Sequence, residues 1–146
     1  MKCRLLDTSP SGLRTLVAVF DTGDEVMAGL KELATKEKLT AAQLSAIGAF
    51  VKAELAYFDW DKKQYQPIRV DEQVEVASML GDIGVDDGGA PALHVHLVLG
   101  RRDGSAVAGH LVEATVRPTL EVVITETPAH LHRRQDPATG LALIRF

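Results

Sequence analysis

Cysteine, aromatic residues and long apolar runs are all scarce in this sequence of 146 residues. With one cysteine, Cys3, neither an internal disulfide nor a cysteine-based metal cluster can form within one chain. Such cysteine usage is typical of a reducing compartment, and we expect a cytoplasmic protein. No apolar run approaches the roughly 20 residues of a membrane-spanning helix, so we expect no membrane partner.

Basic residues are also fewer than acidic ones: the sequence has 16 basic and 20 acidic residues, and the net charge is −4. Because nucleic-acid affinity rests largely on neutralising phosphates, this balance predicts DNA binding that is weak or indirect. The densest basic cluster is HLHRRQ, residues 130–135. Arg101 and Arg102 form a second, beside Asp103 at an expected turn. We interpret both clusters as solvated strand ends and loops.

What the sequence does contain is a set of short extended segments. Its composition, 46% hydrophobic and 25% charged, suits one compact domain over residues 1–146. Residues 13–20 (LRTLVAVF) are rich in branched side chains and predict a buried strand. Later strand-length pieces are AAQLSAIGAF, VKAELAYFDW, QYQPIRV, EQVEVASMLG and PTLEVVITETP, with breaks that include DWDKK and GDIGVDDGGAP, and two short runs flank DPATG.

A single long helix is predicted within residues 21–39. Its apolar residues share one helical stripe, and Asp21 or Thr22 is available as the N-cap. The stripe consists of Val26, Leu30, Leu33 and Ala34. Short links between the strands favour antiparallel pairing, so the predicted class is α+β with a largely antiparallel sheet and one main helix.

Three of the five histidines lie in residues 91–114, PALHVHLVLGRRDGSAVAGHLVEA. Side chains alternate along a strand, so His94 and His96 project from one face with their bases about 7 Å apart. The Asp-Gly pair predicts a hairpin, with a three-residue loop over 102–104 and Gly104 left-handed. That loop sets His96 opposite His110 and places all three rings on one face.

Three neutral imidazoles converging from adjacent strands suit Zn²⁺, with a fourth position open to water or another ligand. Iron, nickel and copper are also compatible with imidazole ligands. The alternative is that His94, His96 and His110 are polar residues on a half-exposed face or in a subunit interface. No catalytic residue is identified, since the nearest carboxylate in sequence, Glu113, falls on the opposite face in this register.

The segment LHVHLVLGRRDGSAVAGHLVEATVRPTLEVVITE, with IGAFVKAELAYFD before it and DPATGLALI after it, resembles the plants-and-prokaryotes conserved (PPC) domain family in its stand-alone bacterial and archaeal form. The most specific features are His-x-His, the Arg-Asp-Gly turn, and Gly109-His110-Leu111 followed by Glu113-Ala114. The resemblance implies an α+β fold, a homotrimer, and a metal at His94, His96 and His110. The family's DNA-binding role comes largely from plant members with an Arg-Gly-Arg-Pro segment, which this sequence lacks.

Two function hypotheses follow. The first is a metal-binding domain that senses, binds or transforms a small ligand. The second is a trimeric interaction module, a DNA-associated regulator in which the histidines are structural.

Overall fold

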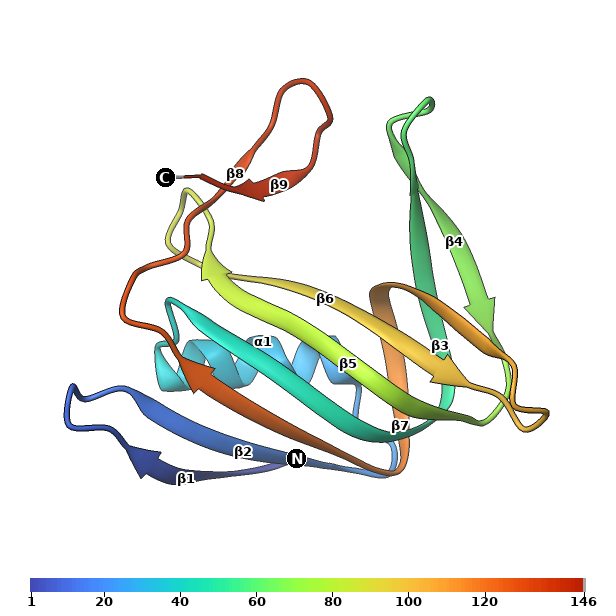
Figure 1. Ribbon diagram of the computed structural model, residues 1–146, viewed down its shortest axis with the longest axis horizontal. Helices are drawn as coiled ribbons and strands as arrows, with labels where there is room; N and C mark the ends of the chain where they lie inside the picture. Colours follow the sequence, from blue (N-terminus) through green and yellow to red (C-terminus); the bar gives the residue numbers. More distant parts are fainter. Residues whose placement is uncertain (146) are drawn as a thin grey trace.

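The computed structural model, which describes residues 1–145, is a strongly bent antiparallel sheet with a helix packed on one face (Figure 1). This arrangement agrees with the predicted α+β class. In chain order the elements are β1 (Lys2–Thr8), β2 (Arg14–Asp21), α1 (Val26–Glu37), β3 (Ala42–Asp59), β4 (Gln64–Val70), β5 (Val74–Val85), β6 (Pro91–Gly100), β7 (Ala106–Glu126), β8 (Arg133–Gln135) and β9 (Ala142–Ile144).

Seven strands form the main sheet in the order β1-β2-β7-β6-β5-β3-β4, and β8 pairs separately with β9. Strands β3 and β7 also pair with each other, so β3, β5, β6 and β7 form a closed ring of antiparallel pairings. Strands β3 and β7 are long, with 18 and 21 residues, and register shifts interrupt the pairing between them. Such irregularities let a strand bend without ending.

The strand boundaries predicted from the sequence are wrong in three places, two of them because these strands bend without ending. AAQLSAIGAF and VKAELAYFDW belong to one strand, β3, and PTLEVVITETP continues β7, the second strand of the histidine hairpin. GDIGVDDGGAP is also not wholly a break, because β5 continues to Val85 and residues 86–90 make the turn. In that turn the Asp86 carboxylate accepts from the N–H groups of Gly88 and Ala90.

Helix α1 lies behind the strands in Figure 1 and closes the core. The predicted stripe is buried, with Val26, Leu30 and Ala34 fully shielded from solvent. The predicted N-cap is wrong: the Glu25 side chain caps the helix and accepts from Met27 and Ala28. A longer side chain closer to the helix makes these bonds in place of Asp21 or Thr22. Within residues 1–145, no helix is long and apolar enough to span a membrane.

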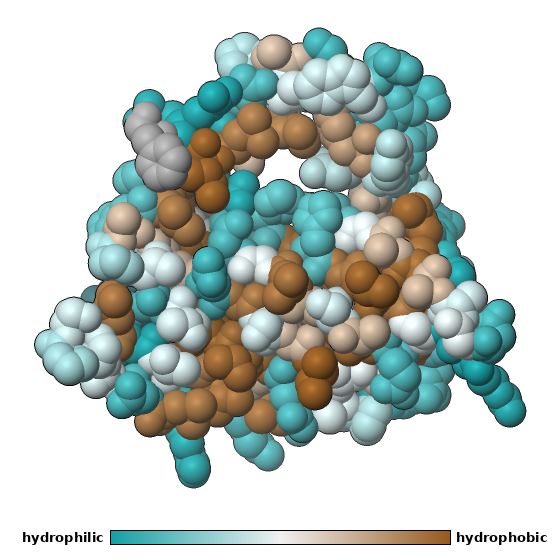
Figure 2. All heavy atoms as spheres, viewed as in Figure 1, coloured by the Kyte–Doolittle hydropathy of each residue, from teal (hydrophilic) through white to brown (hydrophobic). Residues whose placement is uncertain are grey.

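Alternate residues on the central strands of the sheet fill the core between the sheet and α1. On β2 these are Leu16, Ala18 and Phe20, each at most 2% exposed. The other face of the sheet stays open, and Figure 2 shows apolar side chains gathered over it. The segment before β2 forms an edge strand, β1, that the sequence did not predict; all seven of its residues are exposed, so it has no apolar alternation.

Candidate metal centre

The hairpin that carries the histidines has the predicted register. Its loop spans residues 102–104: Arg101 N–H donates to the carbonyl of Ser105 at 2.8 Å, and Gly104 has φ +83°. His96 therefore pairs with His110 across β6 and β7. Gly104 is required here because that backbone conformation is strained for other residues.

Gly109 holds His110 in position by allowing β7 to approach β3 closely. A Cβ atom at Gly109 would lie 2.9 Å from the carbonyl oxygen of Ala56 and 3.2 Å from Cβ of Leu55. The next two residues along β7 pair with the same part of β3, His110 with Ala56 and Leu111 with Leu55. A larger residue at Gly109 would push the strands apart and shift the His110 ring.

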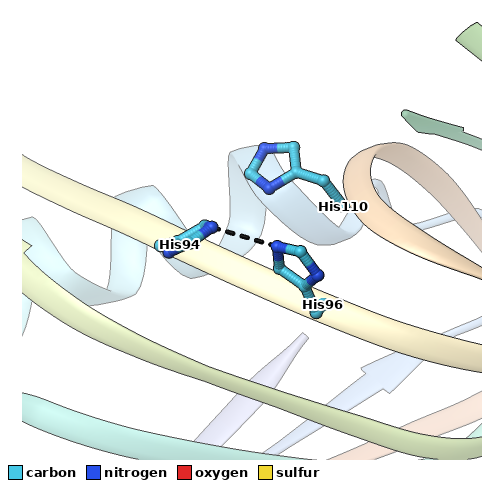
Figure 3. A group of neighbouring side chains, drawn as sticks. All are labelled: His94, His96 and His110. Atoms are coloured by element: carbon cyan, nitrogen blue, oxygen red, sulfur yellow. Dashed lines mark hydrogen bonds between the residues drawn. The ribbon is translucent and has the colours of Figure 1, made fainter. Parts of the chain in front are cut away.

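The three predicted histidines form one group (Figure 3). Nε2 of His94 and Nε2 of His96 lie 3.1 Å apart, and one ring nitrogen from each of the three residues lies within 4.8 Å of the others. In a tetrahedral zinc site with bonds of about 2.0–2.1 Å, ligand atoms lie roughly 3.3 Å apart. One ion could therefore contact all three rings after small side-chain movements.

His110 has the features expected of a metal ligand. Its Nδ1 is buried and has no hydrogen-bond partner, and Figure 3 shows a nitrogen of its ring facing the other two histidines. Burial, together with His94, His96 and Arg133, lowers the pKa of His110 to about 4. The ring is thus neutral at pH 7, which is the form that binds metals. An unpaired buried nitrogen beside two further imidazoles fits a transition-metal ion.

The His94 ring is fixed from its other side by Arg133. Nη2 of Arg133 lies 3.2 Å from Nδ1 of His94. A guanidinium only donates, so Nδ1 is the acceptor in this contact, and a metal bound at Nε2 would displace the proton of the neutral ring. Burial and the Arg133 charge lower the pKa of His94, which favours the neutral ring.

Arg133 and Asp82 are site residues that the sequence interpretation missed. Arg133 is 6% exposed and binds both carboxylate oxygens of Asp82, at 2.8 and 2.7 Å, so the expectation that HLHRRQ is solvated is wrong for this residue. The expectation holds for Arg134, exposed beside Asp87, and for the exposed His130, His132 and Gln135. Asp82 pairs with His94 across β5 and β6. If the sequence interpretation had continued this strand beyond Gly81, it would have placed Asp82 opposite His94. No local sequence pattern identifies Arg133.

A cavity of about 240 Å³ opens beside His94 and His110. Tyr65 of β4 stacks on His110 with ring centroids 4.9 Å apart and also lines this cavity. Glu113 lines a different cleft, next to Lys52. The structure thus groups the histidines with an arginine, a tyrosine and a cavity, and it places Glu113 elsewhere.

An α+β domain with three clustered histidines on its sheet defines the class of protein: a small domain with a candidate metal centre. The chain belongs to the Plants and Prokaryotes Conserved (PCC) domain family, whose sequence profile matches residues 7–128. This is the family that the sequence resembles, and the prediction is confirmed. Among curated proteins, no sequence is significantly similar to this chain.

Several solved structures share the fold over nearly the whole chain. A protein from Archaeoglobus fulgidus described as metal-containing is 30% identical, with a TM-score of 0.82, and the match covers 90% of this chain and 93% of that one. A PPC protein from Pyrococcus horikoshii is 28% identical, with a TM-score of 0.84 and coverages of 99% and 95%. A "putative DNA-binding protein" from Ralstonia eutropha is 28% identical, with a TM-score of 0.83 and coverages of 97% and 95%.

Proposed function

We propose that residues 1–146 act as one domain that binds a divalent metal through His94, His96 and His110. Zinc is the metal that we expect. The observation that carries the proposal is the convergence of three ring nitrogens, one of them buried without a partner. The metal-containing relative from Archaeoglobus fulgidus supports it. Metal analysis of tag-free protein tests it, with about one ion per chain expected.

Three protein ligands leave a fourth position on a tetrahedral ion, which is the arrangement of zinc sites that bind or transform a small molecule. When bound, the ion would act as a Lewis acid at the edge of the cavity beside His110. The role of the protein's own residues is then to orient the ligands: Arg133 and Asp82 hold the ring of His94, and Tyr65 packs on that of His110. No described residue is assigned as a general base.

We propose further that the chain assembles as a homotrimer through the open face of its sheet. Ile47, Leu80 and Val123 are 62%, 61% and 41% exposed. Leu80 of β5 and Val123 of β7 both pair with Ser45 of β3, so they lie in one row across that face. Figure 2 shows that apolar atoms cover much of this side. Such a patch is costly in water and is typical of a subunit interface.

The second candidate function is a DNA-associated regulatory module in which the histidines are structural. The relative from Ralstonia eutropha favours it through its description. The net charge of −4 disfavours direct contact with phosphates, and the buried guanidinium of Arg133 is committed to Asp82. We therefore expect weak or indirect DNA binding. A cytoplasmic location stays a prediction from the single cysteine.

A further inference from the structure

The cavity beside the histidines is lined by both polar and apolar side chains. His94, His110 and Arg133 are the polar ones beside the metal centre, and Leu141 and Leu143 are apolar. Both leucines belong to the segment around β9, and Tyr65 belongs to β4. Residues far apart in the sequence therefore enclose one space.

Two hairpins frame this space. In Figure 1 the β3–β4 hairpin rises at the right of the main sheet and the β8–β9 hairpin rises toward its left, so that they approach each other above it. Their tips meet where the Lys63 ammonium group donates to the carbonyl of Ala138 at 2.7 Å. Figure 2 shows an open hollow beneath this arch of side chains. A small molecule could therefore reach the histidines from solvent without unfolding the sheet.

Charge beside the metal centre favours an anion once a metal is present. Three neutral imidazoles leave the charge of a dication uncompensated, and the positive charge of Arg133 is balanced by Asp82. Among residues 1–145, the side chains that line the cavity include no carboxylate. The open coordination position of the ion would thus attract an anion with an oxygen donor.

Size and polarity restrict the rest of that molecule. The cavity volume of about 240 Å³ is below the roughly 300–1,000 Å³ typical of sites for drug-sized ligands. Leucine side chains offer no hydrogen bonds, so the part of the ligand that contacts them gains most by being apolar. A chain of a few carbon atoms satisfies both conditions.

We propose that this cavity binds a short aliphatic monocarboxylate, with its carboxylate on the metal and its tail against Leu141 and Leu143. The inference rests on the proposed metal site, because without the ion the carboxylate loses its partner. Tyr65 and the leucines then set the length of tail that fits.

The test uses the full chain loaded with Co²⁺, whose visible absorption reports its ligands. Metal binding is established first from the cobalt spectrum. Butyrate is then titrated by calorimetry and absorption, with uncharged butyramide and the longer octanoate as comparisons. Leu141→Trp fills the cavity from a partly exposed hairpin position, whereas Leu6→Trp adds the same ring at an exposed site on β1. Leu141→Ala enlarges the cavity.

Millimolar or tighter butyrate binding is expected for the wild type and for Leu6→Trp, with at least tenfold weaker binding of butyramide and octanoate. The Leu141→Trp variant should show the same cobalt spectrum as the wild type but no butyrate binding. The Leu141→Ala variant should bind octanoate. If cobalt binds and butyrate does not, or if Leu141→Trp binds butyrate as well as the wild type does, the cavity assignment is wrong while the metal site stands. If cobalt does not bind at all, both the metal site and the ligand site are refuted.

Discussion

Arg133 places a guanidinium nitrogen 3.2 Å from Nδ1 of His94, although 39 positions separate the two residues in the sequence. The same nitrogen lies 2.7 Å from a carboxylate oxygen of Asp82. The arginine thus joins the β8–β9 hairpin to the strand that carries two of the three histidines. It connects the stability of the C-terminal hairpin with the order of the metal centre.

Replacing Arg133 by Met should lower the free energy of unfolding by about 1–3 kcal/mol, because it leaves the Asp82 carboxylate without its partner. Urea denaturation of the metal-free protein measures this. Arg134→Met is the matched control: Arg134 is exposed beside an exposed Asp87, and its loss should change stability by less than about 0.5 kcal/mol. Equal effects in the two variants would contradict the structural role of Arg133.

Stability of the metal-free protein should fall as the pH drops below about 6.5. His110 has a pKa of about 4 in the folded chain, against 6.5 for an unperturbed histidine, so the unfolded chain binds more protons between these values. The full stability is therefore present above pH 6.5 and is lost toward pH 4. Urea denaturation at pH 7 and pH 5 should show this loss, and His110→Gln should reduce it. The same loss in both proteins would assign the effect to other groups.

Light scattering at micromolar concentration should give the mass of three chains. Ile47→Lys places a charge on the open apolar face of the sheet and should shift the protein toward monomer, since an interface that excludes water cannot solvate the ammonium. Glu32→Lys, on an exposed position of α1, serves as the control. A wild type of monomer mass would contradict the trimer.

Duplex DNA should bind weakly and without sequence preference. At physiological salt we expect a dissociation constant no tighter than the non-specific range of about 10⁻⁴ to 10⁻⁶ M, because the chain carries a net charge of −4. Fluorescence anisotropy with several unrelated duplexes measures it. A nanomolar complex with one defined sequence would favour the regulator hypothesis instead.

Local patterns predicted the parts of the fold that depend on near neighbours. The Asp-Gly turn set the register that pairs His96 with His110, and the apolar stripe predicted the buried face of α1. The two long bent strands were divided in the prediction, because bulges at positions such as Gly48 interrupt the alternation without ending the strand. Arg133 was missed because its burial depends on Asp82, a contact between distant segments that no local pattern contains.

The central claim is that His94, His96 and His110 hold one metal ion, and elemental analysis of tag-free wild type and His96→Ala, both supplied with zinc, tests it most directly. His96 is exposed and lies on the face opposite the buried leucines of β6, so its replacement should leave the fold intact. Circular dichroism checks this. The account predicts about one zinc per wild-type chain and a loss of most of it in His96→Ala. Equal metal content in the two proteins, or none in either, would contradict it.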